Sequence, residues 1–228
     1  MSLVINGRDA TRLEQTAEEI RESTGVEVTP VAADISTAEG QVALLAACPE
    51  PDILVNNNAG PPFRDFRTLD RHDLLAGVTM NMVTPIELIQ KVIDPMAARG
   101  FGRIVNITSV GVKMPLQGLD LSSGARAGLT AFVAGVARSV AGKNVTINNL
   151  LPGYFATERL RQGFAATARR TGRSEEEVAA EWEASVPAKR LGSPPELGQM
   201  CAFLCSAQAG YVTGQSILVD GGLYPSNF

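Results

Sequence analysis

The sequence predicts a single α/β domain with a doubly wound, Rossmann-like parallel sheet. Apolar segments of strand length alternate along the chain with segments in which apolar residues recur at helical spacing, and this alternation is typical of parallel α/β folds. Some strand segments are continuous apolar runs, as expected for strands buried on both faces. No internal repeat, linker or low-complexity block interrupts the 228 residues, so we expect one domain over residues 1–228.

The first half of the chain is predicted to form three strands and two helices. Leu13, Ala17 and Ile20 lie on one stripe of the first helix, and Gly25 ends that helix. Thr37 is expected to cap the second helix. The predicted strands cover Val4–Asn6, Glu27–Ala33 and Ile53–Val55, and the predicted helices cover Asp9–Ser23 and Thr37–Ala47.

The second half is predicted to continue the alternation. We expect a long helix over Asp73–Ala98 to kink near Pro85, because proline lacks the N–H for one helical hydrogen bond. A helix over Ser122–Ala141 carries Ala and Gly on one face, which suits close packing. The remaining predicted elements are strands at Arg103–Ile107, Val145–Leu151 and Ser216–Val219 and a helix at Pro194–Ser206.

The composition argues against several classes of function. A net charge of −4 and a pI near 5.2 argue against a nucleic-acid partner, which usually leaves a basic surface. His72 is the single histidine, which excludes multi-histidine metal sites, and we expect no bound metal. Three cysteines without a signal peptide favour a reducing cytoplasm. No apolar run approaches the roughly 18 residues of a membrane span, so we expect no membrane association.

Ligands of doubly wound sheets bind beyond the carboxyl ends of the strands, and five motifs follow in order along this chain at or near such positions. They are Asn57-Asn58-Ala59-Gly60, Asn81, Ile107-Thr108-Ser109, Pro152-Gly153 with Thr157, and Val212 to Gly222. In this order the motifs resemble those of the classical short-chain dehydrogenase/reductase family. The resemblance covers nearly the whole chain, from Val4 to about Tyr224.

The resemblance implies an NAD(P)-dependent oxidoreductase that interconverts a carbonyl and an alcohol by hydride transfer. The subgroup of best fit is an atypical one, whose members resemble β-ketoacyl carrier-protein reductases but lack a complete catalytic tetrad. It implies a small-molecule substrate and a homo-oligomer, either a dimer or a tetramer. Catalytic roles fall on Asn81 and Ser109. The implied cofactor-binding residues are Asp34, Ile35, Asn58, Ala59, Gly60, Arg126, Pro152, Gly153, Phe155 and Thr157.

Arg8 follows the first predicted strand and bears on the choice of cofactor. In dinucleotide-binding folds an acidic residue near this position binds the ribose 2′-hydroxyl, whereas an arginine accommodates a 2′-phosphate. Arg8 therefore favours NADP over NAD, with the adjacent Asp9 as the counter-argument. Asp9 also fits a helix N-cap, and Asp34 has the same alternative interpretation beside its expected adenine contact.

The glycine-rich turn of the family, T-G-x-x-x-G-x-G, does not occur in this chain. The first 50 residues contain Gly7, Gly25 and Gly40 alone, whereas that turn brings backbone N–H groups to a pyrophosphate. The first strand and helix of the family are therefore expected to be missing from a longer chain, with about 30 residues absent. A short protein that fills the gap by oligomerising is the alternative.

The Tyr-x-x-x-Lys pair of the family is replaced by Ser122 and Arg126. The spacing of four residues places both side chains on one helix face, but a serine hydroxyl is too weak an acid to replace tyrosine. Arg126 keeps a permanent charge and is expected to hold a ribose or phosphate oxygen, the alternative being a solvated surface charge. Lys113 is a candidate replacement acid if burial lowers its pKa, and an exposed loop lysine otherwise.

The third asparagine before the Asn-Ala-Gly motif and a charged segment in the second half of the chain give two further expectations. Asn56 precedes the two asparagines of the motif, so an extra residue is expected to shift the loop or to form a bulge. The charged segment within residues 155–192 corresponds to a substrate lid, with Phe164, Val178 and Trp182 as its apolar residues. Besides a reductase, the chain is compatible with a dinucleotide-binding but catalytically impaired regulatory or structural protein, or with a protein that binds no nucleotide.

Overall fold

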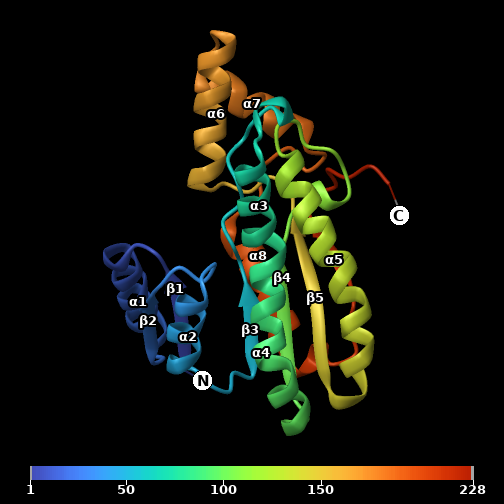
Figure 1. The fold of residues 1–228 in the computed structure, drawn as a ribbon. Helices are drawn as coiled ribbons and strands as arrows, with labels where there is room; N and C mark the ends of the chain where they lie inside the picture. The colour runs from blue at the N-terminus through green and yellow to red at the C-terminus, as the bar shows by residue number, and fades with distance from the viewer. Residues whose placement is uncertain (1, 227–228) are drawn as a thin grey trace.

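The computed structural model describes residues 2–226 and shows parallel strands with helices on both sides (Figure 1). The strands form two separate sheets, β1–β2 and β3–β4–β5–β6, and every pairing within them is parallel. The strands are β1 (Leu3–Gly7), β2 (Val28–Ala32), β3 (Ile53–Asn56), β4 (Gly102–Ile107), β5 (Val145–Pro152) and β6 (Ser216–Val219). The longer helices are α1 (Ala10–Thr24), α2 (Ala38–Ala47), α3 (Arg71–Val78), α4 (Thr84–Arg99), α5 (Asp120–Val140), α6 (Glu158–Thr171), α7 (Glu175–Ser185) and α8 (Pro194–Cys205).

The hydrophobic core lies on both faces of the four-stranded sheet. On one face, Ile104 and Ile147 pack against α4 and α5. On the other face, Val105 and Leu150 pack with Leu204 of α8. All four of these strand residues are fully buried, because successive side chains of a strand point to opposite faces. The prediction of strands buried on both faces is confirmed for β4 and β5.

The same prediction is wrong for Ile53–Val55. Within residues 2–226, β3 pairs with β4 but not with β1, so one edge of β3 is open and the side chain of Val55 is 44% exposed. The gap between β1 and β3 is visible in Figure 1. The two sheets are joined instead through the helices, where Gln41 of α2 donates a hydrogen bond of 2.7 Å to Glu87 of α4.

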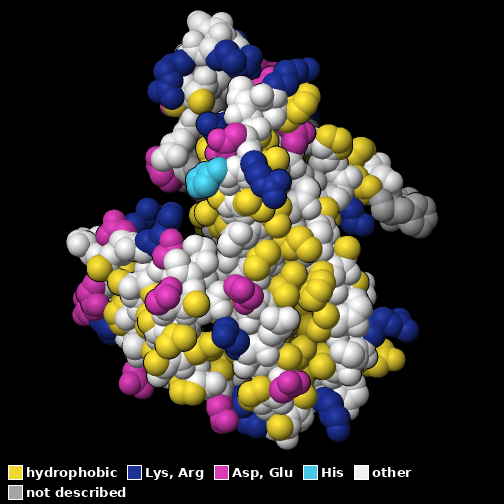
Figure 2. Space-filling model, viewed as in Figure 1, with side chains coloured by type: hydrophobic (Ala, Val, Ile, Leu, Met, Phe, Trp, Pro, Cys, Tyr) yellow, Lys and Arg dark blue, Asp and Glu magenta, His cyan; other side chains and the backbone are white. Residues whose placement is uncertain are grey.

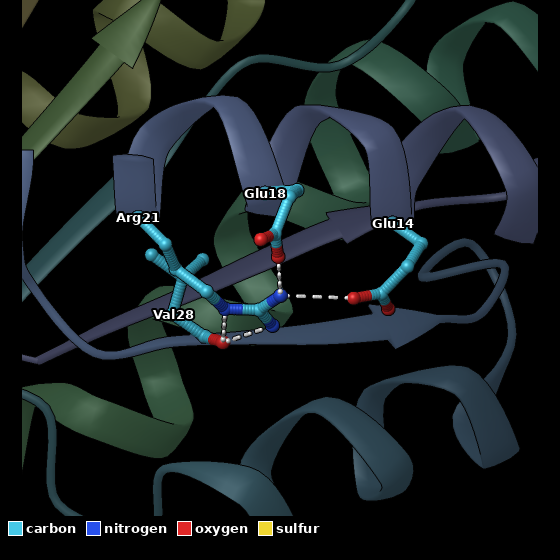
Figure 3. A network of polar contacts seen from close by, with 4 residues as sticks. All are labelled: Glu14, Glu18, Arg21 and Val28. Carbon is cyan, nitrogen blue, oxygen red and sulfur yellow. Dashed lines mark hydrogen bonds and ion pairs between the residues drawn. The ribbon is translucent and has the colours of Figure 1, made fainter. Parts of the chain in front are cut away.

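The two-stranded sheet is covered by α1, which begins at an Asp9 N-cap and ends at Gly25 in the left-handed conformation. Arg21 of α1 donates two hydrogen bonds to the backbone oxygen of Val28 and also contacts Glu14 and Glu18 (Figure 3). The two hydrogen bonds from the Arg21 guanidinium to Val28 link the end of α1 to the start of β2.

The long helix predicted over Asp73–Ala98 is divided into three parts. Helix α3 begins after an Asp70–Asp73 capping box, a π-helical segment covers Thr79–Val83, and α4 follows. Pro85 has no N–H to donate to the carbonyl four residues earlier, and a π-turn is a common response to such an interruption. The predicted irregularity near Pro85 is therefore confirmed, and it takes the form of a wider turn around Asn81.

Helices α6 and α7 form a hairpin that projects beyond the carboxyl ends of the strands (Figure 1). Phe164, Val178 and Trp182, which we expected in a lid, pack together in a small cluster of their own. Trp182 also stacks against Tyr154, with ring centroids 4.6 Å apart. The hairpin is thus anchored to the end of β5 by an aromatic contact.

Apolar side chains also appear on the outer surface, where they gather over the α4–α5 face (Figure 2). Phe132 of α5 is 44% exposed. Cys201 and Cys205 of α8 are packed against the core cluster that contains Leu204, as expected for small apolar side chains. In the part of the chain that the structure describes, no helix combines the length and the apolar character needed to cross a bilayer.

Candidate active site

The carboxyl ends of β3 and β4 meet at the guanidinium of Arg126, which projects from α5. One terminal nitrogen donates to the backbone oxygen of Ile107 at 2.8 Å, and the other donates to that of Asn58 at 3.1 Å. Arg126 is 8% exposed, so the interpretation as a solvated surface charge is wrong. The predicted sharing of a helix face is confirmed, since its Nε donates to Ser122 Oγ at 3.2 Å.

Burial and, next, the nearby charge of Arg159 lower the pKa of Arg126 to about 10. The guanidinium therefore remains charged at neutral pH, in surroundings where its partners are neutral oxygens. The hydrogen bond from Arg126 also determines the role of the Ser122 hydroxyl. Because Ser122 Oγ accepts from Arg126, its own O–H remains free to donate.

Asn81 lies in the π-helical segment and reaches the loop that follows β3. Its Nδ2 donates to the backbone oxygen of Ala59 at 2.9 Å, and the residue is 1% exposed. Within residues 2–226, Asn81 Oδ1 and Asn58 Oδ1 are buried without a hydrogen-bond partner. Unsatisfied buried acceptors are rare in folded proteins, and each of these oxygens is able to accept a hydrogen bond from a bound group.

Ser109 begins the loop after β4, and its Oγ accepts a hydrogen bond of 3.0 Å from the N–H of Gly111. As at Ser122, the hydroxyl proton remains free to donate. Lys113 lies at the end of the same loop and is exposed. The argument for Lys113 as an acid required burial of its ammonium group, so the structure contradicts it.

The end of β5 approaches the segment after β6 closely. A Cβ on Gly153 would lie 2.7 Å from the Cβ of Asp220, so a side chain at this position would collide with that loop. Phe155 is buried and pairs in a bridge with Gly192 at the base of the lid. Thr157 caps α6 by accepting from Leu160 N, and it follows Pro152-Gly153 as the motif requires.

Asp34 and Arg8 lie at the ends of the two strands of the smaller sheet. Asp34 accepts from the N–H and the hydroxyl of Ser36 at 2.9 and 2.7 Å. These bonds and the charge of Arg8 lower the pKa of Asp34. The alternative interpretation of Asp34 as the N-cap of α2 is wrong, because Thr37 provides that cap, and Asp34 instead forms a turn with Ser36. The half-buried Ile35 accepts from Gln41 through its backbone oxygen.

Sequence reasoning missed Arg159, which comes from the first turn of α6. Its terminal nitrogens donate to the backbone oxygens of Gly60 and Pro61 at 3.2 and 2.8 Å. Partial burial lowers the pKa of Arg159. No motif identifies this residue, because its contact with the loop after β3 spans about a hundred positions of sequence.

An in-register ladder of amides was also missed. Asn56 donates to Asn106 at 2.9 Å, Asn106 donates to Asn149 at 3.1 Å, and Asn149 donates to Ser216 at 3.3 Å. Asn56 is therefore a regular residue of β3, in unbroken register with β4. The bulge expected from the third asparagine does not occur within the strand, and a shifted loop beyond it stays a prediction.

A pocket of about 130 Å³ lies beside Ser122. Most of its lining is apolar and comes from α3, the start of α5 and the loop after β3. Arg64 and Asp73 at its rim form an ion pair of 2.5 Å. The site thus combines two hydroxyl donors, two guanidinium groups and an apolar recess on the side where the strands end.

A family model described as enoyl-(acyl carrier protein) reductase matches residues 1–224. The NADPH-dependent reductase BacG of Bacillus subtilis is 30% identical over 226 residues, which is 97% of this chain and 87% of that protein. The chain is a member of the classical short-chain dehydrogenase/reductase family. An acetoacetyl-CoA reductase of Cupriavidus necator is 37% identical over 175 residues, covering 77% of this chain and 67% of that protein.

Solved structures of other short-chain dehydrogenases/reductases share the fold. The L-sorbose reductase of Gluconobacter frateurii, solved with NADPH and L-sorbose, superposes with a TM-score of 0.92 at 26% identity, covering 99% of this chain and 88% of that chain. The fold class and the family resemblance predicted from the sequence are confirmed. That Ser122 and Arg126 stand in place of the family's Tyr-x-x-x-Lys pair stays a prediction from the sequence.

Proposed function

We propose that this protein is a ketoreductase-like enzyme that uses NADPH to reduce a small carbonyl compound to an alcohol. The proposal is supported by relatives named as NADPH-dependent reductase and acetoacetyl-CoA reductase. The observation that carries it is the buried Arg126–Ser122 pair at the ends of β3 and β4. It leaves hydroxyl donors free where a substrate oxygen would bind.

The residues of this chain fit the nicotinamide half of the cofactor. Arg126 uses three of its five N–H groups, and the two that remain suit ribose hydroxyls. The unpartnered Asn58 Oδ1 is an acceptor on the same side. We assign further contacts to Ala59, Gly60, Pro152, Gly153, Phe155 and Thr157. At the adenine end we assign Arg8, Asp34 and Ile35, with the charge of Arg8 favouring NADP over NAD.

When bound, NADPH supplies the hydride. Ser109 and Ser122 donate hydrogen bonds to the carbonyl oxygen, which polarises the carbonyl and stabilises the developing alkoxide. The fixed charge of Arg126 strengthens this effect through Ser122, because the buried site screens charge weakly. Asn81 supports the loop after β3 through Ala59. No tyrosine occupies the position of the family's acid, so the proton comes from water.

The rival proposal is a dinucleotide-binding protein with impaired turnover. The presence of Ser122 at the position of the family's tyrosine favours this rival, since a serine is a far weaker proton donor than a tyrosine. A regulatory or structural role would then use the binding cleft without the chemistry.

Two measurements separate these proposals. Quenching of protein fluorescence by NADPH and NADH tests binding, and oxidation of NADPH with a panel of ketones and aldehydes tests turnover. Binding with turnover supports the reductase, whereas binding without turnover across the panel supports the rival. Failure to bind either nucleotide contradicts both.

The double variant Ser122→Tyr/Arg126→Lys sharpens the result. It restores the family's pair at the observed positions, so we expect at least a tenfold gain on simple carbonyls in a folded protein. Unchanged activity with an intact circular dichroism spectrum would contradict the assignment of these two positions.

We further propose that residues 155–192 act as the substrate lid of a single cytoplasmic domain and that the protein is a homodimer or homotetramer. The apolar side chains that gather over the α4–α5 face (Figure 2) and the exposed Phe132 of α5 support association of copies. Light scattering after size exclusion tests this, and a monomer at micromolar concentration would contradict it.

A further inference from the structure

Arg103, Arg126 and Arg159 each donate to backbone carbonyls, and they differ in the number of N–H groups that they use. Arg103 uses four hydrogen bonds, to Ser206, Gly102 and Asn144. Arg126 uses three and Arg159 uses two. A guanidinium carries five N–H donors. Arg103 is therefore nearly saturated as a structural link, while the other two keep donors available.

Arg126 and Arg159 also converge on one point of the site. A Cβ placed on Gly60 would lie 2.9 Å from both terminal nitrogens of Arg159 and 3.2 Å from Ser122 Oγ. Ser122 in turn accepts from Arg126. Arg159 and Ser122 therefore both pack against the same side of Gly60, and the lack of a side chain there allows the guanidinium and the hydroxyl to lie close to each other.

Neither guanidinium has a counter-charge of its own. Among residues 2–226, neither forms an ion pair with a carboxylate, although Glu158 is adjacent to Arg159 and pairs instead with Arg161. Two like charges near each other in a partly buried site are unfavourable, and an anion that binds between them relieves the repulsion. Arginine forks match the geometry of a carboxylate with two parallel hydrogen bonds.

We propose that the substrate is an oxo acid whose carboxylate binds Arg159 beside Gly60 while its carbonyl oxygen accepts from Ser122. Arg126, which donates to Ser122, contributes a second positive charge near the carboxylate. This inference rests on the proposed reductase function and adds the class of substrate. The apolar portion of this substrate would extend into the pocket lined by Gly77, Met80 and Leu121.

The test compares acids with their neutral esters. Pyruvate, acetoacetate and 4-oxopentanoate are each assayed against the corresponding methyl ester with NADPH, and kcat/KM is measured for every pair. We expect the native protein to prefer at least one acid. A charge-assisted hydrogen bond contributes about 1.5–3 kcal/mol, so Arg159→Gln should reduce the acid-to-ester ratio by roughly 10- to 100-fold.

Two variants make the result specific. Arg159→Lys keeps the charge and should recover part of the preference. Arg161→Gln removes a charge two positions along the same helix, from a side chain that is 70% exposed, and should leave the ratio unchanged. Equal use of acids and esters by the native protein, or a preference that survives Arg159→Gln, overturns the proposal.

Calorimetric titration of the same acids and esters provides a readout that does not require turnover. If NADPH fails to bind, the proposed function fails, yet tighter binding of an acid that depends on Arg159 still supports the anion site. If Arg159→Gln weakens NADPH binding as much as it weakens acid binding, the guanidinium holds a cofactor phosphate, and the proposal is wrong. Equal heats for acid and ester also overturn it.

Discussion

The two sheets of this protein are built from similar sequence but differ in burial. In the four-stranded sheet, β4 and β5 are buried over nearly their whole length, whereas every residue of β1 is half-buried. The run Ile53-Leu54-Val55 is as apolar as the interior of β5, yet it lies at an open edge and Val55 is largely exposed. Burial is therefore determined by the neighbours of a strand on both edges and both faces.

The largest expected effect concerns truncation of the two cores. Leu150→Ala removes a fully buried side chain from the four-stranded sheet and should reduce the free energy of unfolding by about 3–4 kcal/mol. Leu13→Ala acts on the smaller sheet, where the side chain touches solvent, and should cost about 2 kcal/mol. Urea denaturation measures both. Equal costs would contradict the difference between the sheets.

The second effect concerns two arginines that link a helix end or a loop to a strand. Arg103 is 1% exposed, and Arg103→Met should cost about 2–4 kcal/mol because it leaves buried carbonyls unpaired. Arg21 is partly solvated, and Arg21→Met should lower the melting temperature much less than Arg103→Met does. Thermal unfolding of both variants provides the measurement, with the exposed Arg67→Met as a control near zero. A larger loss at Arg21 would reverse the ranking.

The smallest effect concerns two carboxylates, one beside each sheet. Arg190 and Ser193 lower the pKa of Glu196 to about 2, and Ser36 lowers that of Asp34. Both folded pKa values lie below the unfolded ones, so both groups favour folding above their unfolded pKa. This contribution is lost as the pH falls through the folded pKa, between pH 4.5 and about 2 for Glu196.

Carboxyl NMR titration checks these values. Arg190→Gln should raise the pKa of Glu196, and Ser36→Ala should raise that of Asp34 by a smaller amount. An unmoved Glu196 titration in the first variant would show that the ion pair does not hold in solution.

The sequence was sufficient to predict the order of the strands and of most helices, because local apolar spacing and caps such as Asp9 and Thr37 act over a few residues. Helices α6 and α7, in the charged segment, were not predicted. It also indicated that Ser122 and Arg126 share a helix face. It could not indicate the burial of Arg126, the exposure of Lys113 or the role of Arg159. Each depends on contacts between segments far apart in the chain, which no local pattern encodes.

The amide ladder through Asn56, Asn106, Asn149 and Ser216 has one polarity, since each carboxamide donates toward β6. Sliding β4 or β5 by a single residue would break two links, sliding β3 or β6 would break one, and either shift would leave buried amides unsatisfied. The ladder therefore favours a single register of the four strands. The loops after β3 and β4 begin where these strands end, so the register of the strands also determines where Asn58 and Ser109 lie. The interior amides therefore contribute to the geometry of the site.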